Sequence, residues 1–387
     1  MMNKVIPYGK QSISQDDINA VIDVLKSDWL TQGPVVPVFE KAIADYCGAN
    51  DACATNSATS ALHIACLALS VGESDLVWTS PISFVASSNC ALYCGAEVDF
   101  VDIDLETGNM SVTALKEKLI VAKHNKRLPK VVIPVHLAGQ SCDMVAINEL
   151  AKEYGFKIIE DASHAIGATY KNKPVGSCEY SDITVFSFHP VKIITSAEGG
   201  MAVTNCEKLN KKMKRLRSHG ITNNPDEMTE PSHGPWYYQQ IELGFNYRMT
   251  DIQAALGLSQ LKQLDNFVRV RNDIAKTYDH AFANPAVAHL IQSNDCYSSY
   301  HLYIVRLTQC GVEKHKSVIT GMREQGIIAH LHYIPIHLQP YYQALGFSEG
   351  DFPNAETYYK QAVTIPVHPT MTAQEQQFVI NTLIGLV

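Results

Sequence analysis

Apolar and polar positions follow two different patterns along this chain, one with helical spacing and one of short apolar strands. Between residues 14 and 27 apolar side chains recur at helical spacing, and Ser14 followed by Asp17 is a helix-capping pair. This pattern predicts an amphipathic helix. Residues 28–34 interrupt it and predict a loop, and Phe39 and Ile43 then mark the apolar face of a second helix.

From about Ala52 onward, short apolar strands alternate with helical patterns such as Val145–Tyr154. The predicted strands are Asp75–Thr79, Val98–Ile103, Lys130–Val135, Lys157–Asp161, Ile183–Phe188 and Met201–Thr204. Such alternation is typical of an α/β fold with a mostly parallel sheet covered by helices. Ligands of these sheets bind beyond the carboxyl ends of the strands.

The last third of the chain has a different pattern. A helix capped by Thr250 and Gln253 is predicted to run toward Val268, and a smaller mixed region follows, with strands at Tyr303–Leu307 and Ile327–His332. We therefore predict a large domain over residues 1–265 and a small C-terminal α/β domain over 266–387. The Pro- and Gly-rich residues 223–234 predict an inserted loop, flexible or ordered by a partner.

Composition narrows the class of protein. The 387 residues are 46% hydrophobic and 18% charged, with a formal net charge of -8. This profile is globular and offers no basic surface for nucleic acid or an anionic membrane. The basic run at 208–217 predicts the solvated face of a helix. With no apolar signal core, no apolar run of about 18 residues and ten scattered cysteines, we expect a cytoplasmic protein with free thiols.

Lys192 and Asp161 carry the chemistry that the sequence indicates. Asp161 ends a predicted strand, and Lys192 follows another and precedes a Glu-Gly-Gly turn. A cofactor aldehyde needs a lysine amine of lowered pKa, and its ring nitrogen needs a carboxylate. Taken singly, such a lysine is usually a surface residue and such an aspartate can be a helix N-cap. Together they predict a pyridoxal-phosphate enzyme.

Several weaker signals fit the same cofactor. Small residues at 56–61 open an apolar helical run, and a helix N-terminus suits a phosphate. Ser187 can donate a hydroxyl, Phe84 can stack on a ring, and His164 can line the cofactor, although Phe84 and His164 are also ordinary core residue types. The histidines of 330–337 lack an accompanying carboxylate or cysteine, so we expect no metal there and favour substrate or dimer contacts. No Gly-rich nicotinamide or ATP motif occurs.

At these positions the chain resembles a known family. It is similar to the sugar-nucleotide aminotransferases of the DegT/DnrJ/EryC1 group, which are fold-type-I pyridoxal-phosphate enzymes whose large domain has a mostly parallel seven-stranded sheet sandwiched by helices. The similarity covers essentially the whole chain. It is carried by the motifs at 56–61 (NSATSA), 160–164 (EDASH), 187–192 (SFHPVK), 198–200 (EGG) and 244–249 (GFNYRM).

The resemblance implies a role for each of these motifs. Lys192 would hold the cofactor covalently, Asp161 would meet its ring nitrogen and Phe84 would stack on its ring. The phosphate and the remainder of the cofactor would contact Ser57, Ala58, Thr59, His164 and Ser187. Asn246 would reach the phosphate from the neighbouring subunit, so the resemblance implies a homodimer with shared active sites.

Other stretches look most like the pseudaminic-acid branch of the family, which makes UDP-4-amino-4,6-dideoxy-N-acetyl-β-L-altrosamine from its 4-keto precursor with L-glutamate as amino donor, releasing 2-oxoglutarate. They include residues 29–33, 79–86, 187–189 and 332–335. By this resemblance the UDP-sugar would contact Tyr8, Asp28, Trp29, Leu30, Thr31, Arg248, Leu331, His332, Tyr333 and Ile334. Ser196-Ala197 departs modestly from the family pattern, and the loop after Asn223 is longer than in some relatives.

Three alternatives stay open at this point. The chain could be another 4-keto sugar aminotransferase, of the perosamine or UDP-arabinose type. It could be a related sugar dehydratase, but those have a histidine in place of the lysine, and Lys192 argues against this. It could also be a regulatory or binding protein of the same fold that no longer catalyses, which the intact Lys192, Asp161 and Asn246 disfavour.

Overall fold

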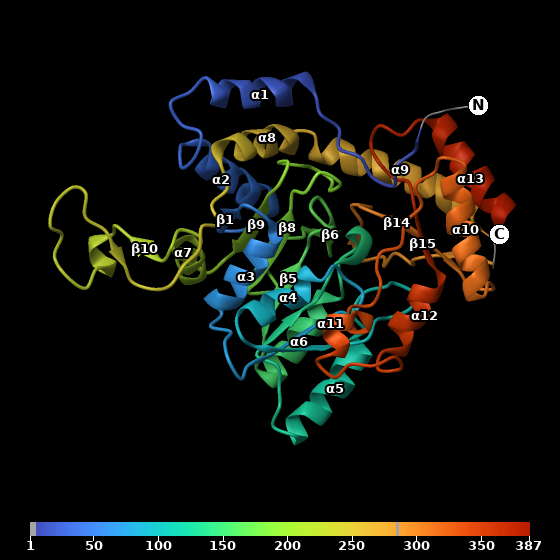
Figure 1. The fold of residues 1–387 in the computed structure, drawn as a ribbon, viewed down its shortest axis with the longest axis horizontal. Coiled ribbons are helices and arrows are strands. Elements are labelled where there is room, and N and C mark those ends of the chain that lie inside the picture. The colour runs from blue at the N-terminus through green and yellow to red at the C-terminus, as the bar shows by residue number, and fades with distance from the viewer. Residues whose placement is uncertain (1–4, 284–285) are drawn as a thin grey trace.

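The computed structural model describes residues 5–283 and 286–387; residues 1–4, part of the region where no signal segment is expected, lie outside it. Its centre is a seven-stranded sheet in the order β1-β9-β8-β5-β4-β2-β3 (Figure 1). The strands are β1 (Asp51–Thr55), β2 (Leu76–Thr79), β3 (Glu97–Phe100), β4 (Val131–Ile133), β5 (Lys157–Asp161), β8 (Ile183–Ser187) and β9 (Gly200–Thr204). Within this sheet β9 runs antiparallel to both of its neighbours, so the predicted mostly parallel sheet is confirmed.

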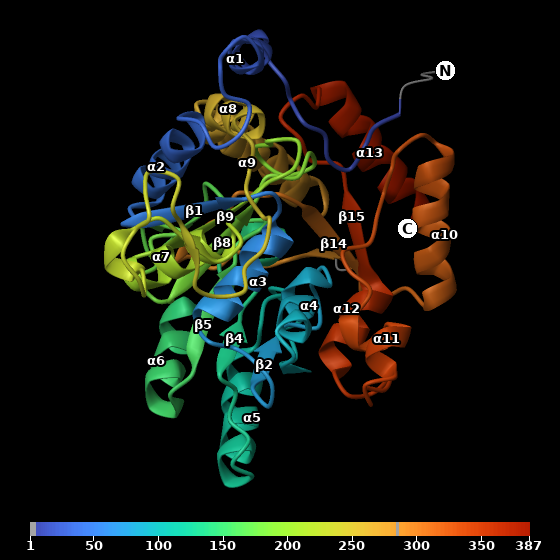
Figure 2. The same ribbon diagram turned by 60° about the vertical axis from the view of Figure 1, so that its left-hand side comes forward.

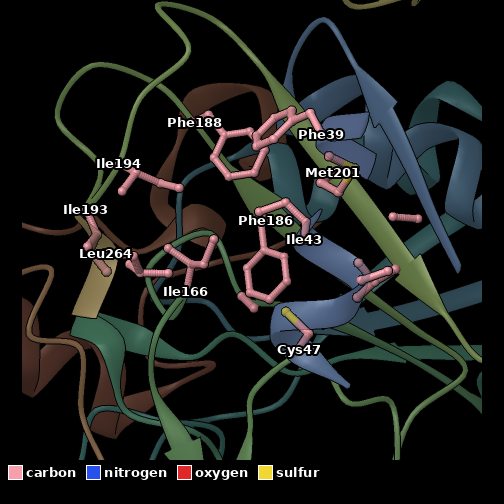
Figure 3. Close-up of a cluster of buried hydrophobic side chains, with 14 of the residues drawn as sticks. Phe39, Ile43, Cys47, Ile166, Phe186, Phe188, Ile193, Ile194, Met201 and Leu264 are labelled. Atoms are coloured by element: carbon pink, nitrogen blue, oxygen red, sulfur yellow. The ribbon is translucent and has the colours of Figure 1, made fainter. Parts of the chain in front are cut away.

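Helices cover both faces of this sheet. Helices α3 (Ala58–Ala68), α4 (Ala86–Tyr93) and α7 (Glu207–Leu216) pack on one face, where they share a core with apolar residues of the strands. The other face is covered by α2 (Val35–Cys47), α5 (Val112–His124) and α6 (Met144–Tyr154). Figure 3 shows part of the core beneath α2, in which Phe39, Phe186 and Phe188 lie together. Burial of these apolar faces is what holds the layers together.

A smaller antiparallel sheet lies in the C-terminal part. It has the order β12-β14-β15, from β12 (Val287–His289), β14 (Tyr303–Leu307) and β15 (Ala362–Ile365). Figure 2 shows α10 (Val312–Glu324) and α13 (Ala373–Leu386) on one side of it, and α12 (Pro353–Gln361) lies against the other. The shorter elements are β6 (Thr169–Tyr170), β7 (Lys173–Pro174), β10 (Ile221–Thr222), β11 (Gln239–Gln240), β13 (Cys296–Tyr297) and α11 (Pro340–Gln343).

Helices at the N-terminus and in the middle of the chain link these parts. The predicted first helix is α1 (Gln15–Leu25), and its capping box joins Ser14 and Asp17 as predicted. It lies along α8 (Asp251–Leu261), as Figure 1 shows. The next helix, α9 (Leu264–Ala281), packs its first half on the core of the large sheet and its second half on that of the small sheet. The proposed domain boundary between residues 265 and 266 falls at the start of α9.

Three sequence predictions differ from the structure. The helix capped by Thr250 ends at Leu261 instead of running toward Val268, because α9 begins a new helix at Leu264. Residues 327–332 form no strand; they pair only through isolated bridges, such as Ile6 with Ile327. The basic run at 208–217 is not wholly solvated, because Lys214 and Arg217 pair with the buried carboxylate of Glu40.

The helices show no sign of a membrane segment. Across residues 5–283 and 286–387, none has the length and continuous apolar character that crossing a bilayer requires.

The close approach of β9 to the start of α3 can be tested by substitution. A Cβ on Gly200 would lie 2.5 Å from the backbone nitrogen of Ala58 and equally close to the backbone of Ser57. We expect Gly200→Ala to shift the first turn of α3 and to lower the free energy of unfolding by about 1–3 kcal/mol. The midpoint of thermal unfolding would fall accordingly. Gly72→Ala is the matched control, because a Cβ at Gly72 meets no atom within 4 Å; equal midpoints in the two variants would contradict the close approach.

Candidate active site

The candidate site lies where the strand ends of the large sheet converge. Asp161 ends β5 and Ser187 ends β8, while Asn56 follows β1, and the turn after β2 carries Phe84. Because β9 runs the other way, its first residue, Gly200, pairs with Thr55 at this same edge. The side chains around this edge enclose a cavity of about 700 Å³, within the usual size of small-molecule sites.

Lys192 reaches the cavity from the turn after β8. Its backbone N–H donates to the carbonyl of His189 at 2.9 Å, which closes this turn. The side chain lines the cavity. Burial lowers the pKa of the Lys192 amine to about 8, and the nearby carboxylate of Asp161 opposes part of this decrease. An amine with such a pKa is largely neutral at slightly alkaline pH and can act as a nucleophile.

Asp161, at the end of β5, lines the cavity and is 5% exposed. Its Oδ1 accepts hydrogen bonds from the backbone N–H and the hydroxyl of Ser163, at 3.1 and 2.5 Å. Its Oδ2 accepts from the hydroxyl of Ser87 at 2.6 Å. Three donors are thus directed at one carboxylate and hold both of its oxygens in place at the cavity.

His164 lies beside Asp161 in sequence and borders the same cavity. Its Nδ1 accepts the backbone N–H of Ala138 at 3.3 Å, so the proton resides on Nε2, which lies 3.1 Å from the hydroxyl oxygen of Tyr333. Burial holds the pKa of His164 well below its usual value, and the charge of Lys192 lowers it further. His164 is therefore a neutral donor that orients Tyr333.

The first turn of α3 offers an anion site. The hydroxyl of Ser57 caps this helix by accepting the N–H of Ser60 at 3.2 Å. Ala58 and Thr59 are the first two helical residues, and the N–H groups of a first turn have no partner within their own helix. Both residues line the cavity, so their N–H groups and the helix dipole are placed to bind a phosphate there.

The cavity brings together most of the residues that the sequence singled out. Its lining includes Tyr8, Ser57, Ala58, Thr59, Phe84, Asp161, His164, Ser187, Lys192, His332 and Tyr333. Phe84 is 60% exposed, so its ring is free to cover a ligand in the cavity. The roles of these residues toward a ligand stay predictions.

The other predicted residues lie outside the cavity of this chain. They are Asp28, Trp29, Leu30, Thr31, Asn246, Arg248, Leu331 and Ile334. Leu30 and Thr31 lie at the start of α8, where the Leu30 carbonyl accepts the N–H of Asp251. Asn246 is exposed, and its strand-like contact is with Ser218. The contact predicted for Asn246 is with the phosphate in the site of a neighbouring subunit, and it stays a prediction.

The sequence reasoning missed the serines around Asp161. Ser83 and Ser163 line the cavity, and Ser87 donates to Asp161 from a position 74 residues earlier in the chain. Ser163 had a local signal, since a serine two residues after an aspartate often closes a turn with it. Ser87 had none.

This set of residues fits pyridoxal 5'-phosphate. The cofactor needs a neutral amine, a charged carboxylate and phosphate donors within one enclosure. Lys192, Asp161 and the start of α3 supply these groups in the cavity described above. Among the described residues, no group of three or more His, Cys, Asp or Glu side chains is placed to hold a metal ion.

Comparison with known proteins agrees with this chemistry. The chain matches the model of the DegT/DnrJ/EryC1/StrS aminotransferase family over residues 11–384. It is 39% identical to the UDP-4-amino-4,6-dideoxy-N-acetyl-beta-L-altrosamine transaminase of Campylobacter jejuni, a similarity that covers 99% of this chain and 97% of the relative.

The solved structures that resemble this chain also include sugar aminotransferases. Helicobacter pylori PseC, an aminotransferase involved in the biosynthesis of pseudaminic acid, superimposes with a TM-score of 0.90 at 34% identity, covering 99% of both chains. Spr1654 of Streptococcus pneumoniae, in its PLP form, gives a TM-score of 0.89 at 30% identity, covering 99% of this chain and 98% of that one. Spr1654 is described as a sugar aminotransferase on a provisional basis. The chain therefore belongs to the DegT/DnrJ/EryC1/StrS aminotransferase family and is a sugar aminotransferase that uses pyridoxal 5'-phosphate.

Proposed function

We propose that this enzyme transfers the amino group of L-glutamate to the C4 keto carbon of a UDP-4-keto-6-deoxy-N-acetylhexosamine, a step in pseudaminic acid biosynthesis. The observation that carries the chemistry is the meeting of Lys192, Asp161 and the start of α3 in one cavity. The choice of substrate rests on the similarity to the Campylobacter jejuni transaminase.

Each proposed role is supported by the position of a residue in this cavity. When bound, pyridoxal 5'-phosphate supplies an electron-withdrawing ring that stabilises a carbanion on the attached amino acid. Lys192 Nζ would hold the cofactor covalently and, once freed by the amino donor, would move a proton between the Cα of the donor and C4′ of the cofactor. Asp161 would hold the proton on the ring nitrogen throughout.

The same groups would serve both halves of the reaction. In the first, L-glutamate leaves as 2-oxoglutarate; in the second, the keto sugar receives the amino group, and Lys192 moves the proton in the opposite direction. The N–H groups of Ala58 and Thr59 and the hydroxyl of Ser187 would bind the phosphate. Tyr8, His332 and Tyr333 also line the cavity, and they would contact the sugar.

Two alternatives predict different products. A perosamine- or UDP-arabinose-type enzyme would aminate a different 4-keto nucleotide sugar with the same residues. A regulatory member of the fold would form no amino sugar at all. Lys192, with its lowered pKa and its place in the cavity, favours an enzyme over a regulator.

Replacing Lys192 should remove both amination and covalent attachment of the cofactor. For Lys192→Ala we expect kcat to fall by at least about 10²–10⁴-fold, the size of a general acid–base contribution. Lys41→Ala is the control, because Lys41 is exposed and pairs with Asp45 on the surface of its own helix. Mass spectrometry of the product formed from each of a panel of 4-keto nucleotide sugars measures amination directly. A Lys192→Ala enzyme with activity near that of the control would refute the role, and amination of only a different sugar would refute the substrate.

Capture of the cofactor by the apoprotein should depend on pH through Lys192. The pKa of this amine is lowered to about 8, so the amine is mostly protonated below pH 8 and neutral above it. Only the neutral amine is nucleophilic. The rate of capture, followed by the absorbance of the bound cofactor, should therefore rise about tenfold per pH unit up to about pH 8 and then level off. A rate that kept rising to the ordinary lysine pKa of 10.5 would contradict the burial effect.

A dimer with shared sites can be tested by mixing two variants. If Asn246 reaches the phosphate of the partner's site, a mixed dimer of Lys192→Ala and Asn246→Ala chains has one site with both defects and one intact site. Activity should then reappear when the two variants, each weakly active alone, are unfolded and refolded together. Activity that stays at the average of the separate variants would place Asn246 in the site of its own chain or in none.

A further inference from the structure

Three buried oxygens form a hydrogen-bonded line that begins and ends at residues lining the cavity. The hydroxyl oxygens of Ser83 and Ser87 lie 2.6 Å apart, and that of Ser87 lies 2.6 Å from Oδ2 of Asp161. The three residues are 3%, 0% and 5% exposed. Ser83 belongs to the turn after β2, Ser87 to α4 and Asp161 to β5, so the line joins three separate elements.

The direction of each hydrogen bond follows from counting protons. A charged carboxylate only accepts, so Ser87 must donate its single proton to Asp161. The oxygen of Ser87 can then only accept from Ser83, and Ser83 must donate to it. The carbonyl of Phe84 lies farther from the Ser87 hydroxyl, at 3.3 Å, and is the weaker acceptor for its proton. The line is therefore directional, from Ser83 through Ser87 to Asp161.

We propose that Ser83 and Ser87 are positioning residues for the transamination, which deliver one directed hydrogen bond to Oδ2 of Asp161 and so hold this carboxylate in position opposite the cofactor ring. The inference rests on the proposed role of Asp161. With Ser163 on Oδ1, both oxygens of the carboxylate are restrained. A carboxylate restrained at both oxygens cannot rotate, and it keeps the orientation that pairing with a ring cation requires.

The line also joins Asp161 to the segment that precedes α4. Ser83 is followed at once by Phe84, whose ring lies at the cavity 6.4 Å from that of Tyr333. The hydrogen bond to the Ser87 hydroxyl holds Ser83 in place. It therefore also restrains the backbone of Phe84, the next residue. The two groups expected on the face and at the nitrogen of the same ring are thus held by one chain of hydrogen bonds.

Removing the Ser87 hydroxyl should change the charge at the ring. Oδ2 of Asp161 would lose its hydrogen-bond donor and hold the ring proton more strongly, so the ring would carry less positive charge. The nitrogen that links the cofactor to Lys192 would then bind a proton more readily. In Ser87→Ala we therefore expect the pH at which the bound cofactor changes absorbance to rise by about half a unit or more. We also expect kcat to fall about tenfold with little change in KM.

The control is Ser88→Ala. Ser88 is adjacent, fully buried and on the same helix, but its hydroxyl bonds with the hydroxyl of Tyr342 at 2.5 Å, away from Asp161. Its loss should leave the absorbance titration unchanged. Ser83→Ala, which breaks the line one step earlier, should give a smaller shift in the same direction as Ser87→Ala, and Ser87→Thr, which keeps the donor, should restore the titration.

Asp161→Asn separates this inference from the proposed function. It should give the largest upward shift, and the titration needs no sugar substrate. If Asp161→Asn shifts the titration and neither Ser87→Ala nor Ser83→Ala does, the positioning role is wrong although Asp161 acts as proposed. An equal shift in Ser88→Ala would reduce the effect to a loosened α4 and would also overturn it. If Asp161→Asn causes no shift, the proposed role of Asp161 fails and the inference fails with it.

Discussion

The pairing of β5 with β8 is the constraint on which the site depends. Its register sets Asp161 opposite Val185, two residues before Ser187 ends β8 and the turn to Lys192 begins. Side chains alternate between the faces of a strand, so the neighbouring carboxylate of Glu160 points to the other face. There it contacts His136 at 2.7 Å. A slip of one residue would exchange these two carboxylates and leave the cavity without the carboxylate proposed to pair with a ring nitrogen.

The two carboxylates also show how surroundings decide function. Burial alone would raise the pKa of Glu160, but hydrogen bonds from His136, Ser181 and Thr184 lower it below its usual value. All of its partners are protein groups, so Glu160 is satisfied within the fold. Asp161 accepts only from serine residues and borders open space. Of two adjacent acids, the one with a free side toward the cavity is the one that can serve a ligand.

The sequence predicted local features better than distant ones. Helix α1, β5 and β14 match their predicted positions because capping pairs and apolar runs are local signals. The motifs also located Lys192 and Asp161. The strand predicted at 327–332 failed because its apolar residues are buried by contacts such as that of Ile327 with Ile6 at the other end of the chain, without a ladder of hydrogen bonds. Ser87 was missed because a serine within a helix gives no sign of an acceptor 74 residues away.

Several of the residues that the cavity leaves out are exposed, and this exposure bears on assembly. Trp29 and Leu30 are 57% and 45% exposed, and Leu243, close to Asn246 in sequence, is 79% exposed. Large apolar side chains left in water cost free energy, and where they gather they mark contact surfaces. These are the segments that family resemblance assigns to the nucleotide sugar and to the partner's phosphate site. If a second chain completed the site, it would bury these exposed side chains. That burial would both close the cavity and stabilise the pair.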